Sequence, residues 1–579
     1  MRHQNSLLLS LLALTACGGV SDEQPDPSIG LSRFASCDAM ADHVTESFLF
    51  SMTAGIYGGR VSDDMLAEAD TADAGSSDGG SGPSNYSTTN VQERGVDEAD
   101  LVKTDGDYVY VLDHGTLSIV RSWPAETAEL VGQVDLNPIS GEGSVSEKMF
   151  LSDDRILVYT NEWNERDESW VQQTGLVVVD ISNRKRPEVI QEKLLDGHMV
   201  SARMIGSDVY TVLNSNISLP YEVYDKIWEM DAMLHSDLLD IGWDATVPER
   251  FFARERLKRF YRPFVADALA EMGAERLIPT ITHEDGTTER MMDCTDILHS
   301  TEISDAGLTT VAHIDLDADT IKVSGNSTGV MAGSTTVYAS PKNLYVAQSS
   351  HGWWDGLSEI ERETRIHRLA LKGSESRYEA SGSVEGYLHN QFSMSEYKGM
   401  LRVSTTYDDW SWGTESANDK SGNNIFILDA EQAQMGLIGA VTGLAPGERI
   451  YATRFQGQRA YMVTFVQVDP LFTFDLSVPT MPRAVGELKI PGYSSYLHPI
   501  GTDHVLGVGM SGDWDGWIAG VAVSLFDVSD FADPKQQDLL TLDCDESWSE
   551  ALWDHHAILI YDDIVAIPAY GYDWSGSGW

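Results

Sequence analysis

Charged residues gather just ahead of the first clear strand expected in the repeats. Asp97, Glu98, Asp100 and Lys103 stand close together, and the apolar run of that strand begins near Tyr108. Carboxylates at this spacing could share a cation or divide a general acid and base task between them. They could equally form hydrogen bonds and an ion pair that fix the turn leading into the first strand. The residues alone leave both roles open.

Tryptophan and acidic residues recur together in five segments. Ten of the 15 tryptophans lie in NEWNERDESW, SSHGWWDGLSE, TYDDWSWGTES, SGDWDGWIAG and YGYDWSGSGW, which we expect to be loops. Flat aromatic faces interleaved with carboxylates suit sugars, cationic groups or peptides. We therefore predict a ligand-binding rim made of Trp163, Trp353, Trp354, Trp410, Trp412, Trp514, Trp517, Asp513 and Asp515. The alternative is that each tryptophan folds back to cover its own loop.

No other pattern indicates a reaction or a resident metal. The 15 histidines contain no HExxH pair, and the adjacent His555 and His556 would point apart on a strand. Residues 507–512 satisfy GxGxxG, but the DWDGW that follows is a poor helix start, so we assign a loop and not a dinucleotide site. We expect no catalytic residue and no cofactor. Calcium could order the acidic loops, and the metal content stays open.

These residues belong to a pattern that repeats from Leu101 at intervals of about 50 residues. A turn rich in Asp and Gly leads into a short apolar run, as in DGDYVYVLDHGTLSIV and later in KNLYVAQSS and GMLRVSTTY. Repeated strands without crossover helices are typical of β-propeller blades. The sequence therefore predicts an all-β fold, a β-propeller of seven to eight four-stranded blades.

The blades are expected at 101–136, 145–197, 199–330, 331–386, 387–443, 444–492 and 493–544. An eighth begins near Trp553 and holds two strands where four are expected. Either strands near Ser87–Thr89 complete it or the last blade is incomplete, and we favour the second. Equivalent loops of four-stranded blades emerge on one side of the disc, so the tryptophan-bearing segments should surround one mouth of the channel.

The chain begins with an export signal, residues 1–16. Its apolar run, Leu7–Leu14, is too short to span a bilayer, and the LTAC that closes it resembles the lipobox of bacterial lipoproteins. In that family the cysteine, here Cys17, receives the lipid. The alternative is an ordinary cleavable signal with a chance cysteine.

The rest of the chain divides by composition. We expect a tether at 17–30, an amphipathic helix at 31–57, a low-complexity linker at 58–87 and the propeller domain at 88–579, with a helical insertion at 222–290. Besides Cys17 the chain has Cys37, Cys294 and Cys544, which allow one disulfide and one thiol. We favour Cys37–Cys294 because both lie beside helical segments outside the repeats, and the other pairings stay open.

The formal charge of −51 comes from 90 acidic and 39 basic residues. Binding to nucleic acid, or to an anionic bilayer through a basic face, is therefore not expected. An acidic surface of this kind is typical of proteins kept soluble at raised salt.

Long segments resemble a family of secreted bacterial and archaeal proteins named for its β-propeller domain. They include TTNVQERGVDEADLVKTDGDYVYV (88–111), HNQFSMSEYKGMLRVSTTYD (389–408), GELKIPGYSSYLHPIGTDHVLGVG (486–509) and WDHHAILIY (553–561). The first of these contains the acidic cluster Asp97, Glu98, Asp100 and Lys103. The resemblance implies the fold and an exported location, and it brings no established enzymatic activity.

Together these observations predict a lipid-anchored, exported β-propeller that binds without catalysis. Gly18, and not Asp, follows Cys17, which resembles lipoproteins sent to the outer membrane of a Gram-negative bacterium. The expected partners are the membrane through the N-terminal lipid and a glycan, peptide or envelope protein, with no nucleic acid. The rival predictions are a hydrolase or lyase that uses paired carboxylates at the channel mouth, and a purely structural envelope protein.

Overall fold

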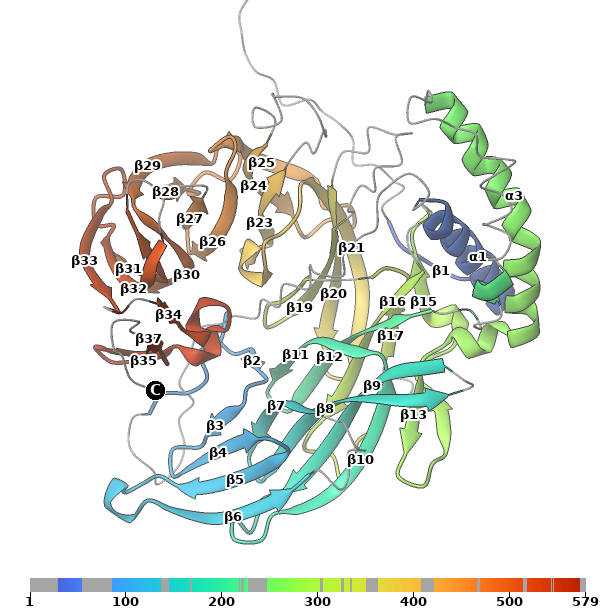
Figure 1. Cartoon of the computed structure of the whole chain (residues 1–579), viewed down its shortest axis with the longest axis horizontal. Coiled ribbons are helices and arrows are strands. Elements are labelled where there is room, and N and C mark those ends of the chain that lie inside the picture. The colour runs from blue at the N-terminus through green and yellow to red at the C-terminus, as the bar shows by residue number, and fades with distance from the viewer. Residues whose placement is uncertain are drawn as a thin grey trace, which may run out of the picture.

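The structure is a computed structural model in which strands predominate. It describes residues 30–54, 86–136, 145–166, 169–217, 219, 223–226, 247–301, 303, 306–323, 327–333, 336–349, 363–407, 421–465, 469–513, 518–542, 544 and 546–572. Within these residues the strands form seven sheets of four or more strands and two of two strands (Figure 1). The prediction of an all-β fold is confirmed.

Five sheets have four strands each, taken in chain order and paired antiparallel. They are β3 (Val102–Thr104), β4 (Tyr108–Asp113), β5 (Thr116–Arg121) and β6 (Glu129–Asp135); β18 (Thr336–Ala339), β19 (Asn343–Ser349), β20 (Glu363–Lys372) and β21 (Glu375–Glu385); β22 (Met394–Tyr397), β23 (Met400–Tyr407), β24 (Gly422–Asp429) and β25 (Leu437–Leu444); β26 (Arg449–Gln456), β27 (Arg459–Phe465), β28 (Asp469–Asp475) and β29 (Arg483–Ile490); and β30 (Gly492–Ile500), β31 (His504–Gly512), β32 (Ile518–Asp527) and β33 (Lys535–Thr541).

Two larger sheets are extended by strands from outside the repeats. One joins β7 (Val145–Ser152), β8 (Arg155–Arg166), β9 (Ser169–Asp180) and β10 (Glu188–Asp196) to β13 (Thr280–His283) and β14 (Thr288–Arg290). The other runs in the order β1-β15-β17-β16-β12-β11-β2. Its strands are β1 (Ser32–Arg33), β2 (Asp97–Glu98), β11 (His198–Ile205), β12 (Asp208–Asn216), β15 (Ile297–His299), β16 (Gly307–Asp315) and β17 (Ser327–Val330).

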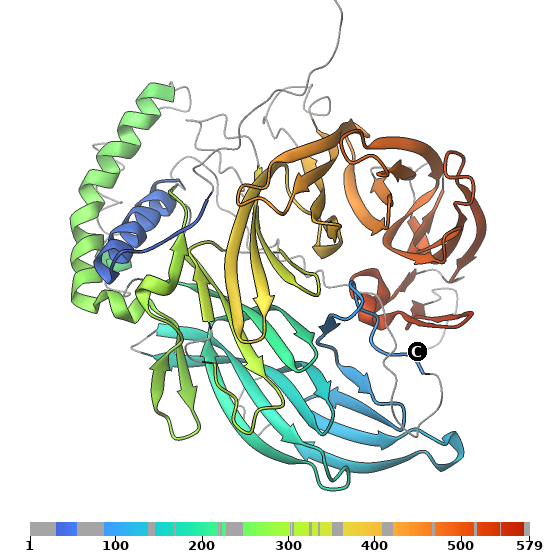
Figure 2. The same ribbon diagram turned by 180° about the vertical axis from the view of Figure 1, so that it is seen from behind.

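The C-terminal strands pair in two short sheets. β34 (Glu546–Trp548) pairs with β37 (Tyr570–Tyr572), and β35 (Leu559–Tyr561) pairs with β36 (Ile564–Ala566). Both views show this region beside β2 and β3, so the first and last parts of the described propeller domain lie together (Figures 1 and 2). A hydrogen bond of 2.9 Å from Asn90 to the backbone of His555 joins them.

The hydrophobic core is divided into layers between successive sheets. Tyr345 of β19 and Leu401 of β23 share one layer, and Tyr461 of β27 and Phe526 of β32 share another. Inner strands such as β24 are buried along almost their whole length, whereas the edge strand β33 is mostly exposed. Strands covered on both faces must be apolar on both, which explains the continuous apolar runs in the sequence.

Two helices form a separate layer at the outer edge. α1 (Cys37–Ala54) lies between α3 (Val247–Met272) and the sheets in both views (Figure 2). Val44 and Leu49 of α1 pack with Leu257 and Tyr261 of α3 in the largest core cluster. A disulfide joins Cys37 to Cys294, with Cα atoms 5.2 Å apart. No helix within the described part of the chain has the length and apolarity needed to cross a membrane.

Short 3₁₀ helices mark several turns. They are η2 (Ala125–Thr127), η3 (Ala274–Leu277), η4 (Cys294–Asp296), η5 (Gln391–Ser393), η7 (Glu550–Leu552) and η8 (His555–Ala557). Of these, η5 and η8 supply side chains to the candidate site.

The structure corrects three details of the sequence analysis. The N-terminal helix starts at Cys37 and not at residue 31, because residues 32–33 pair with β15 and Ser36 Oγ accepts a hydrogen bond from Ala39 N. The insertion is helical only in part, since the β13–β14 hairpin adds to the sheet of β10. The GxGxxG segment is part of strand β31 and not a loop.

Candidate functional site

Residues 90–103, here called the hub segment, contact the inner parts of several sheets. Asn90 donates a hydrogen bond to Tyr496 Oη of β30 (3.4 Å), and Gln92 donates to the backbone of Gln391 and Met394 (3.1 Å each). β2 pairs with β11, and Asp100 forms a backbone bridge with Met149 of β7. The hub segment therefore ties together strands that are hundreds of residues apart in sequence.

The acidic cluster of the hub segment does not form one site. Lys103 Nζ lies 2.8 Å from Asp97 Oδ1 and also donates to the backbone carbonyl of Glu98. Asp100 Oδ1 accepts a hydrogen bond from Leu101 N at 2.7 Å. Asp97 and Glu98 are adjacent on β2, so their side chains leave opposite faces of the strand. The ion pair thus fixes the turn into the first sheet, while Glu98 belongs to another cluster.

Glu98 is buried among polar side chains. Its carboxylate accepts hydrogen bonds from Gln92 N (3.0 Å) and Gln391 Nε2 (3.2 Å), and its Oε2 lies 3.6 Å from the Arg203 guanidinium. Only 2% of the Glu98 side chain is exposed. Burial raises the pKa of Glu98, but the charges of Arg203 and His556 and the bond from Gln92 outweigh burial and hold the pKa below its ordinary value.

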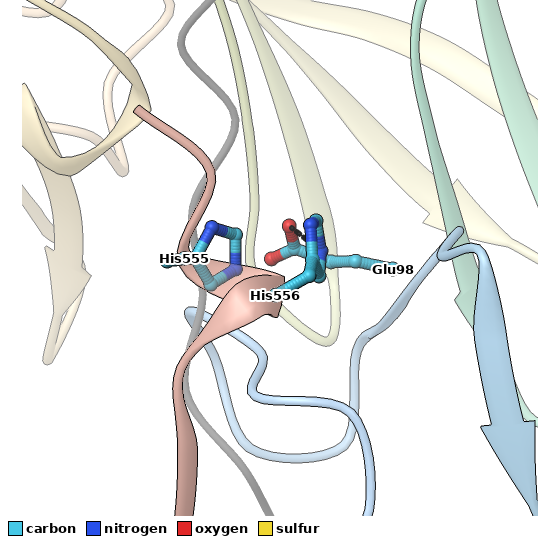
Figure 3. A group of neighbouring side chains, drawn as sticks. All are labelled: Glu98, His555 and His556. Atoms are coloured by element: carbon cyan, nitrogen blue, oxygen red, sulfur yellow. Dashed lines mark ion pairs between the residues drawn. The ribbon is translucent and has the colours of Figure 1, made fainter. Parts of the chain in front are cut away.

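His555 and His556 complete the cluster, and here the expectation from sequence is wrong. They lie in η8 and not on a strand, so their rings do not point apart, and the ring centroids are 3.9 Å from each other. Figure 3 shows both imidazoles beside the Glu98 carboxylate. One donor atom from each of Glu98, His555 and His556 lies within 4.8 Å of the other two.

Hydrogen bonds orient both rings. Asp554 caps η8 by accepting from His556 N (2.9 Å), and the same Oδ1 accepts from His556 Nδ1 (2.7 Å). His555 Nε2 donates to the Asn90 carbonyl at 3.0 Å. Each ring uses one nitrogen in these hydrogen bonds. The second nitrogen of each ring is therefore the atom that can bind a further proton or ligand.

The two histidines differ in charge. Burial, together with the charge of His556, lowers the pKa of His555 well below its ordinary value, so this ring is neutral. Burial also lowers the pKa of His556, but the carboxylates of Asp554 and Glu98 overcome it and raise the pKa to about 9. At neutral pH His556 is therefore an imidazolium, and its positive charge is balanced by the carboxylates of Asp554 and Glu98.

A second feature is an aromatic cluster made of Tyr451, Phe465 and Tyr493. The Tyr451 ring centroid lies 5.4 Å from that of Phe465 and 5.0 Å from that of Tyr493, and Phe465 and Tyr493 are 5.1 Å apart. These residues stand at the start of β26, the end of β27 and the start of β30. All three rings are partly exposed.

The aromatic cluster lies at the end of its sheets where the second strand leaves for the third. We call this end of the sheets the loop face. The tryptophan-bearing segments 350–362, 408–420 and 514–517 make the same connection in their own sheets, from β19, β23 and β31. The aromatic cluster was not among the predicted rim residues, because its members come from strand ends and not from a tryptophan-rich segment.

The predicted rim falls mostly outside the described residues. Trp163 lies in β8 within a β8–β9 hairpin, so its segment is not a loop, and 58% of the residue is exposed. Asp513 follows β31 and is exposed. The other rim residues, Trp353, Trp354, Trp410, Trp412, Trp514, Trp517 and Asp515, lie outside the described residues, as does Cys17.

Sequence reasoning missed the residues that surround Glu98, His555 and His556, which we call the hub cluster. Arg203, Gln391 and Asp554 stand in three different parts of the chain, and nothing in their local spacing links them. One signal was at hand: the alternative in which strands near Ser87–Thr89 complete the last blade would bring the start of the domain close to the segment near Trp553.

Comparisons with known proteins bear on the fold. The model of a family described as "Beta propeller domain" matches residues 86–578. An uncharacterised protein of Methanocaldococcus jannaschii is 29% identical over 510 residues, which cover 84% of this chain and 74% of the relative. An uncharacterised protein of Archaeoglobus fulgidus is 28% identical over 494 residues, which cover 82% of this chain and 74% of the relative.

Two solved structures are also similar at low identity. Hsv2 of Kluyvelomyces marxianus matches at 6% identity with a TM-score of 0.33, covering 76% of this chain and 96% of that chain. Kluyveromyces lactis Hsv2 matches at 6% identity with a TM-score of 0.32 and the same coverage.

Proposed function

This chain belongs to the beta propeller domain family, and from that premise we propose that it is a non-catalytic binding protein of the cell envelope. A lipid on Cys17 anchors it to the outer membrane, and the loop face binds a glycan or peptide. The tryptophan-bearing segments and the aromatic cluster together supply the binding surface.

The observation that supports this proposal is the partly exposed aromatic cluster of Tyr451, Phe465 and Tyr493. Three partly exposed rings from two sheets meet at one end of those sheets, and partly exposed aromatic clusters commonly mark binding surfaces. The Arg449 guanidinium lies 5.1 Å from the Tyr451 ring centroid and supplies a hydrogen-bond donor beside the rings.

The chemistry of this surface favours flat or cationic ligands. Sugar rings present C–H faces that pack on aromatic planes, and cationic groups are attracted to aromatic faces and carboxylates. The acidic residues of the tryptophan-bearing segments add to that attraction. We therefore expect neutral or basic ligands to bind better than anionic ones.

The test is a glycan and peptide array probed with the protein lacking the signal and Cys17. Tyr451→Ala and Tyr493→Ala, alone and combined, and the pair Trp410→Ala/Trp514→Ala should each reduce binding to any hit by at least about tenfold, since aromatic anchors dominate such surfaces. Phe252→Ala is the matched control, because Phe252 is a 65% exposed ring on α3.

Two outcomes would count against the proposal. Loss of binding in Phe252→Ala alone would move the binding surface to α3. An array without hits, or hits that survive all the loop-face substitutions, would remove ligand binding at this face. Separately, radiolabelled palmitate should label the full chain and not a Cys17→Ser variant if the lipid anchor is correct.

One observation favours a hydrolase or lyase as the second candidate. Burial raises the pKa of Glu93, and the charge of Glu396 adds to this. Tyr338 Oη donates to Glu93 Oε1 at 2.7 Å. A carboxyl whose pKa is raised beside a second carboxylate suits general acid chemistry. However, Ser340, Asn343 and Tyr345 all donate to Glu396 Oε2, which favours a structural carboxylate.

Glu93→Gln separates the two candidates. If the protein is an enzyme, the native chain should release products from array hits and the Glu93→Gln variant should release none. If it is a binding protein, neither the native chain nor the variant should release products.

A further inference from the structure

We propose that Glu98, His555 and His556 bind one divalent transition-metal ion of the Zn²⁺ type, which clasps the hub segment to the C-terminal turn η8. This inference is independent of the ligand proposed for the loop face. It rests on the distances between the donor atoms, on the hydrogen bonds that orient the rings, and on a buried nitrogen that has an ion-pair neighbour, Glu98, but no hydrogen-bond partner.

The donor spacing fits an ion better than a direct contact. His556 Nε2 lies 3.7 Å from Glu98 Oε2, beyond the range of a hydrogen bond. Two ligands about 2.1 Å from one Zn²⁺ at a tetrahedral angle lie about 3.4 Å apart. One donor atom from each of the three residues lies within 4.8 Å of the other two, so binding of an ion would draw the three side chains slightly closer together.

The imidazoles are held as metal ligands usually are. A ligating histidine generally donates its other ring N–H to a carboxylate or a backbone carbonyl, which fixes the tautomer. His556 Nδ1 meets Asp554 Oδ1 at 2.7 Å, and His555 Nε2 meets the Asn90 carbonyl at 3.0 Å. With these bonds in place, an ion that displaces the His556 proton would meet Nε2 of His556 and Nδ1 of His555.

His556 Nε2 is the atom that most needs a partner. The His556 side chain is 3% exposed, and within the described part of the chain Nε2 has no hydrogen-bond partner. A buried polar atom without a partner is costly, and native structures rarely keep one without an ion or water. Figure 3 shows this ring edge facing the Glu98 carboxylate.

The ligand types select the class of ion. Two imidazole nitrogens and one carboxylate oxygen suit zinc, iron or a neighbouring first-row ion, whereas Ca²⁺ and Mg²⁺ prefer oxygen alone. Arg203 also contacts Glu98 Oε2, at 3.6 Å, so the carboxylate serves both cations. The competitor for the site is a proton on His556, held between Asp554 and Glu98.

The ion would connect parts of the chain that lie far apart in the sequence. Glu98 stands in the hub segment and the histidines near the C-terminus, so one ion closes a loop of more than four hundred residues. Binding energy at such a site becomes folding energy, because the unfolded chain has no preformed site. A chelator should therefore lower the thermal stability of the whole protein.

The first test uses Co²⁺ as a spectroscopic probe on the full-length protein. We expect one equivalent to bind, with visible absorption bands of nitrogen and oxygen coordination that Zn²⁺ abolishes on displacement. We also expect chelation to lower the melting temperature and Zn²⁺ to restore it. Absence of saturable Co²⁺ binding, or a melting temperature that chelation leaves unchanged, would overturn the proposal in favour of the imidazolium.

Variants locate the ion. Glu98→Gln and His556→Gln should abolish the one-equivalent site, and Asp554→Asn should weaken Co²⁺ binding by about 10–100-fold because it replaces the carboxylate partner of a ligand with a neutral amide. His504→Gln is the control, since His504 bonds to Gln537 at an exposed position. Unchanged Co²⁺ binding in Glu98→Gln and His556→Gln would place the ion elsewhere and refute the assignment. Should either variant fail to fold, the chelation result on the native chain decides.

Discussion

Asn90 and His555, 465 positions apart in the sequence, are joined by two hydrogen bonds: Asn90 Nδ2 donates to the His555 carbonyl at 2.9 Å, and His555 Nε2 donates to the Asn90 carbonyl at 3.0 Å. Both residues are buried. This reciprocal pair connects the beginning of the hub segment to η8, so the contact depends on the first and last parts of the domain being correctly placed.

Asn90→Ala should lower the free energy of unfolding by about 1–3 kcal/mol, because it leaves the buried His555 carbonyl without its side-chain donor. Urea unfolding followed by circular dichroism measures the change. Asn183→Ala, at an exposed turn, is the control and should change stability by less than about 0.5 kcal/mol. Equal effects of the two substitutions would show that the Asn90 contact contributes nothing.

Lys103→Met should destabilise the protein by about 1.5–3 kcal/mol, since it removes charged hydrogen bonds to Asp97 and to the Glu98 carbonyl. The Lys103 side chain is 5% exposed, so water replaces these bonds poorly. For comparison, Lys535 pairs with Asp533 on the surface, and Lys535→Met should change stability by about 0–1 kcal/mol. Denaturant midpoints at constant m-value test both, and a Lys103→Met midpoint equal to that of the native chain contradicts the argument.

Glu192 should contribute a loss of stability as the pH rises from 4.5 to 7. Burial raises the pKa of Glu192 from 4.5 to about 7, and the charges of Glu162 and Glu284 add to this. Between these values the folded chain holds a proton that the unfolded chain has released, so rising pH favours unfolding. Glu192→Gln removes this contribution.

Melting curves between pH 4 and pH 8 measure the effect of Glu192→Gln. The variant should match the native chain at pH 4 and be more stable at pH 8. Glu188→Gln, at an exposed position on the same strand, should keep the native pH profile. A Glu192→Gln profile parallel to the native one would show that the carboxylate has its ordinary affinity for protons.

Features that depend on residues close together in the sequence, such as strands and short-range ion pairs, were the ones that could be predicted. Apolar runs such as the one in Gly422–Asp429 predict strands because inner strands are covered on both faces, and the sheets follow the repeat. The ion pair of Asp97 and Lys103 was one of the two predicted roles of this cluster, since the two residues flank the same bend and are close in sequence. The assignment of 507–512 to a loop failed because glycines at close backbone contacts look like turn residues.

The hub cluster was beyond local patterns. Glu98, Arg203, Gln391 and His556 meet only because the hub segment passes along the inner strands, and no spacing within one repeat records that path. The adjacent pair His555 and His556 was assigned to a strand from its apolar neighbours, whereas the cap from Asp554 folds it into a 3₁₀ turn. A search for alternating apolar and polar residues does not detect an N-cap residue such as Asp554, which directly precedes the pair.

Reduction of the Cys37–Cys294 disulfide should loosen the packing of α1 against α3. The bond closes a loop with a sequence separation of 257, and removing a native disulfide typically costs about 2–5 kcal/mol. Cys37→Ser should therefore lower the melting temperature and expose α1 to limited proteolysis. Cys544→Ser is the control, because Cys544 is not disulfide-bonded. Proteolysis of α1 at the native rate in Cys37→Ser would refute this role.

Gly509→Ala should be among the most damaging single-methyl substitutions in the protein. A Cβ at Gly509 would meet the Tyr493 carbonyl oxygen at 1.8 Å, so β31 could not stay paired with β30 in its present register. Overpacking of this kind costs about 3 kcal/mol or more when backbone atoms must move.

Gly206→Ala is the comparison. The φ of Gly206, +66°, is strained for alanine, but no atom lies within 4 Å of the added Cβ. The cost should therefore stay near 1–2 kcal/mol, an order-of-magnitude figure for the left-handed backbone. Because Tyr493 belongs to the aromatic cluster, Gly509→Ala should also weaken ligand binding at the loop face, whereas Gly206→Ala should not. Equal stability of the two variants would mean that the β30–β31 contact is looser than the structure shows.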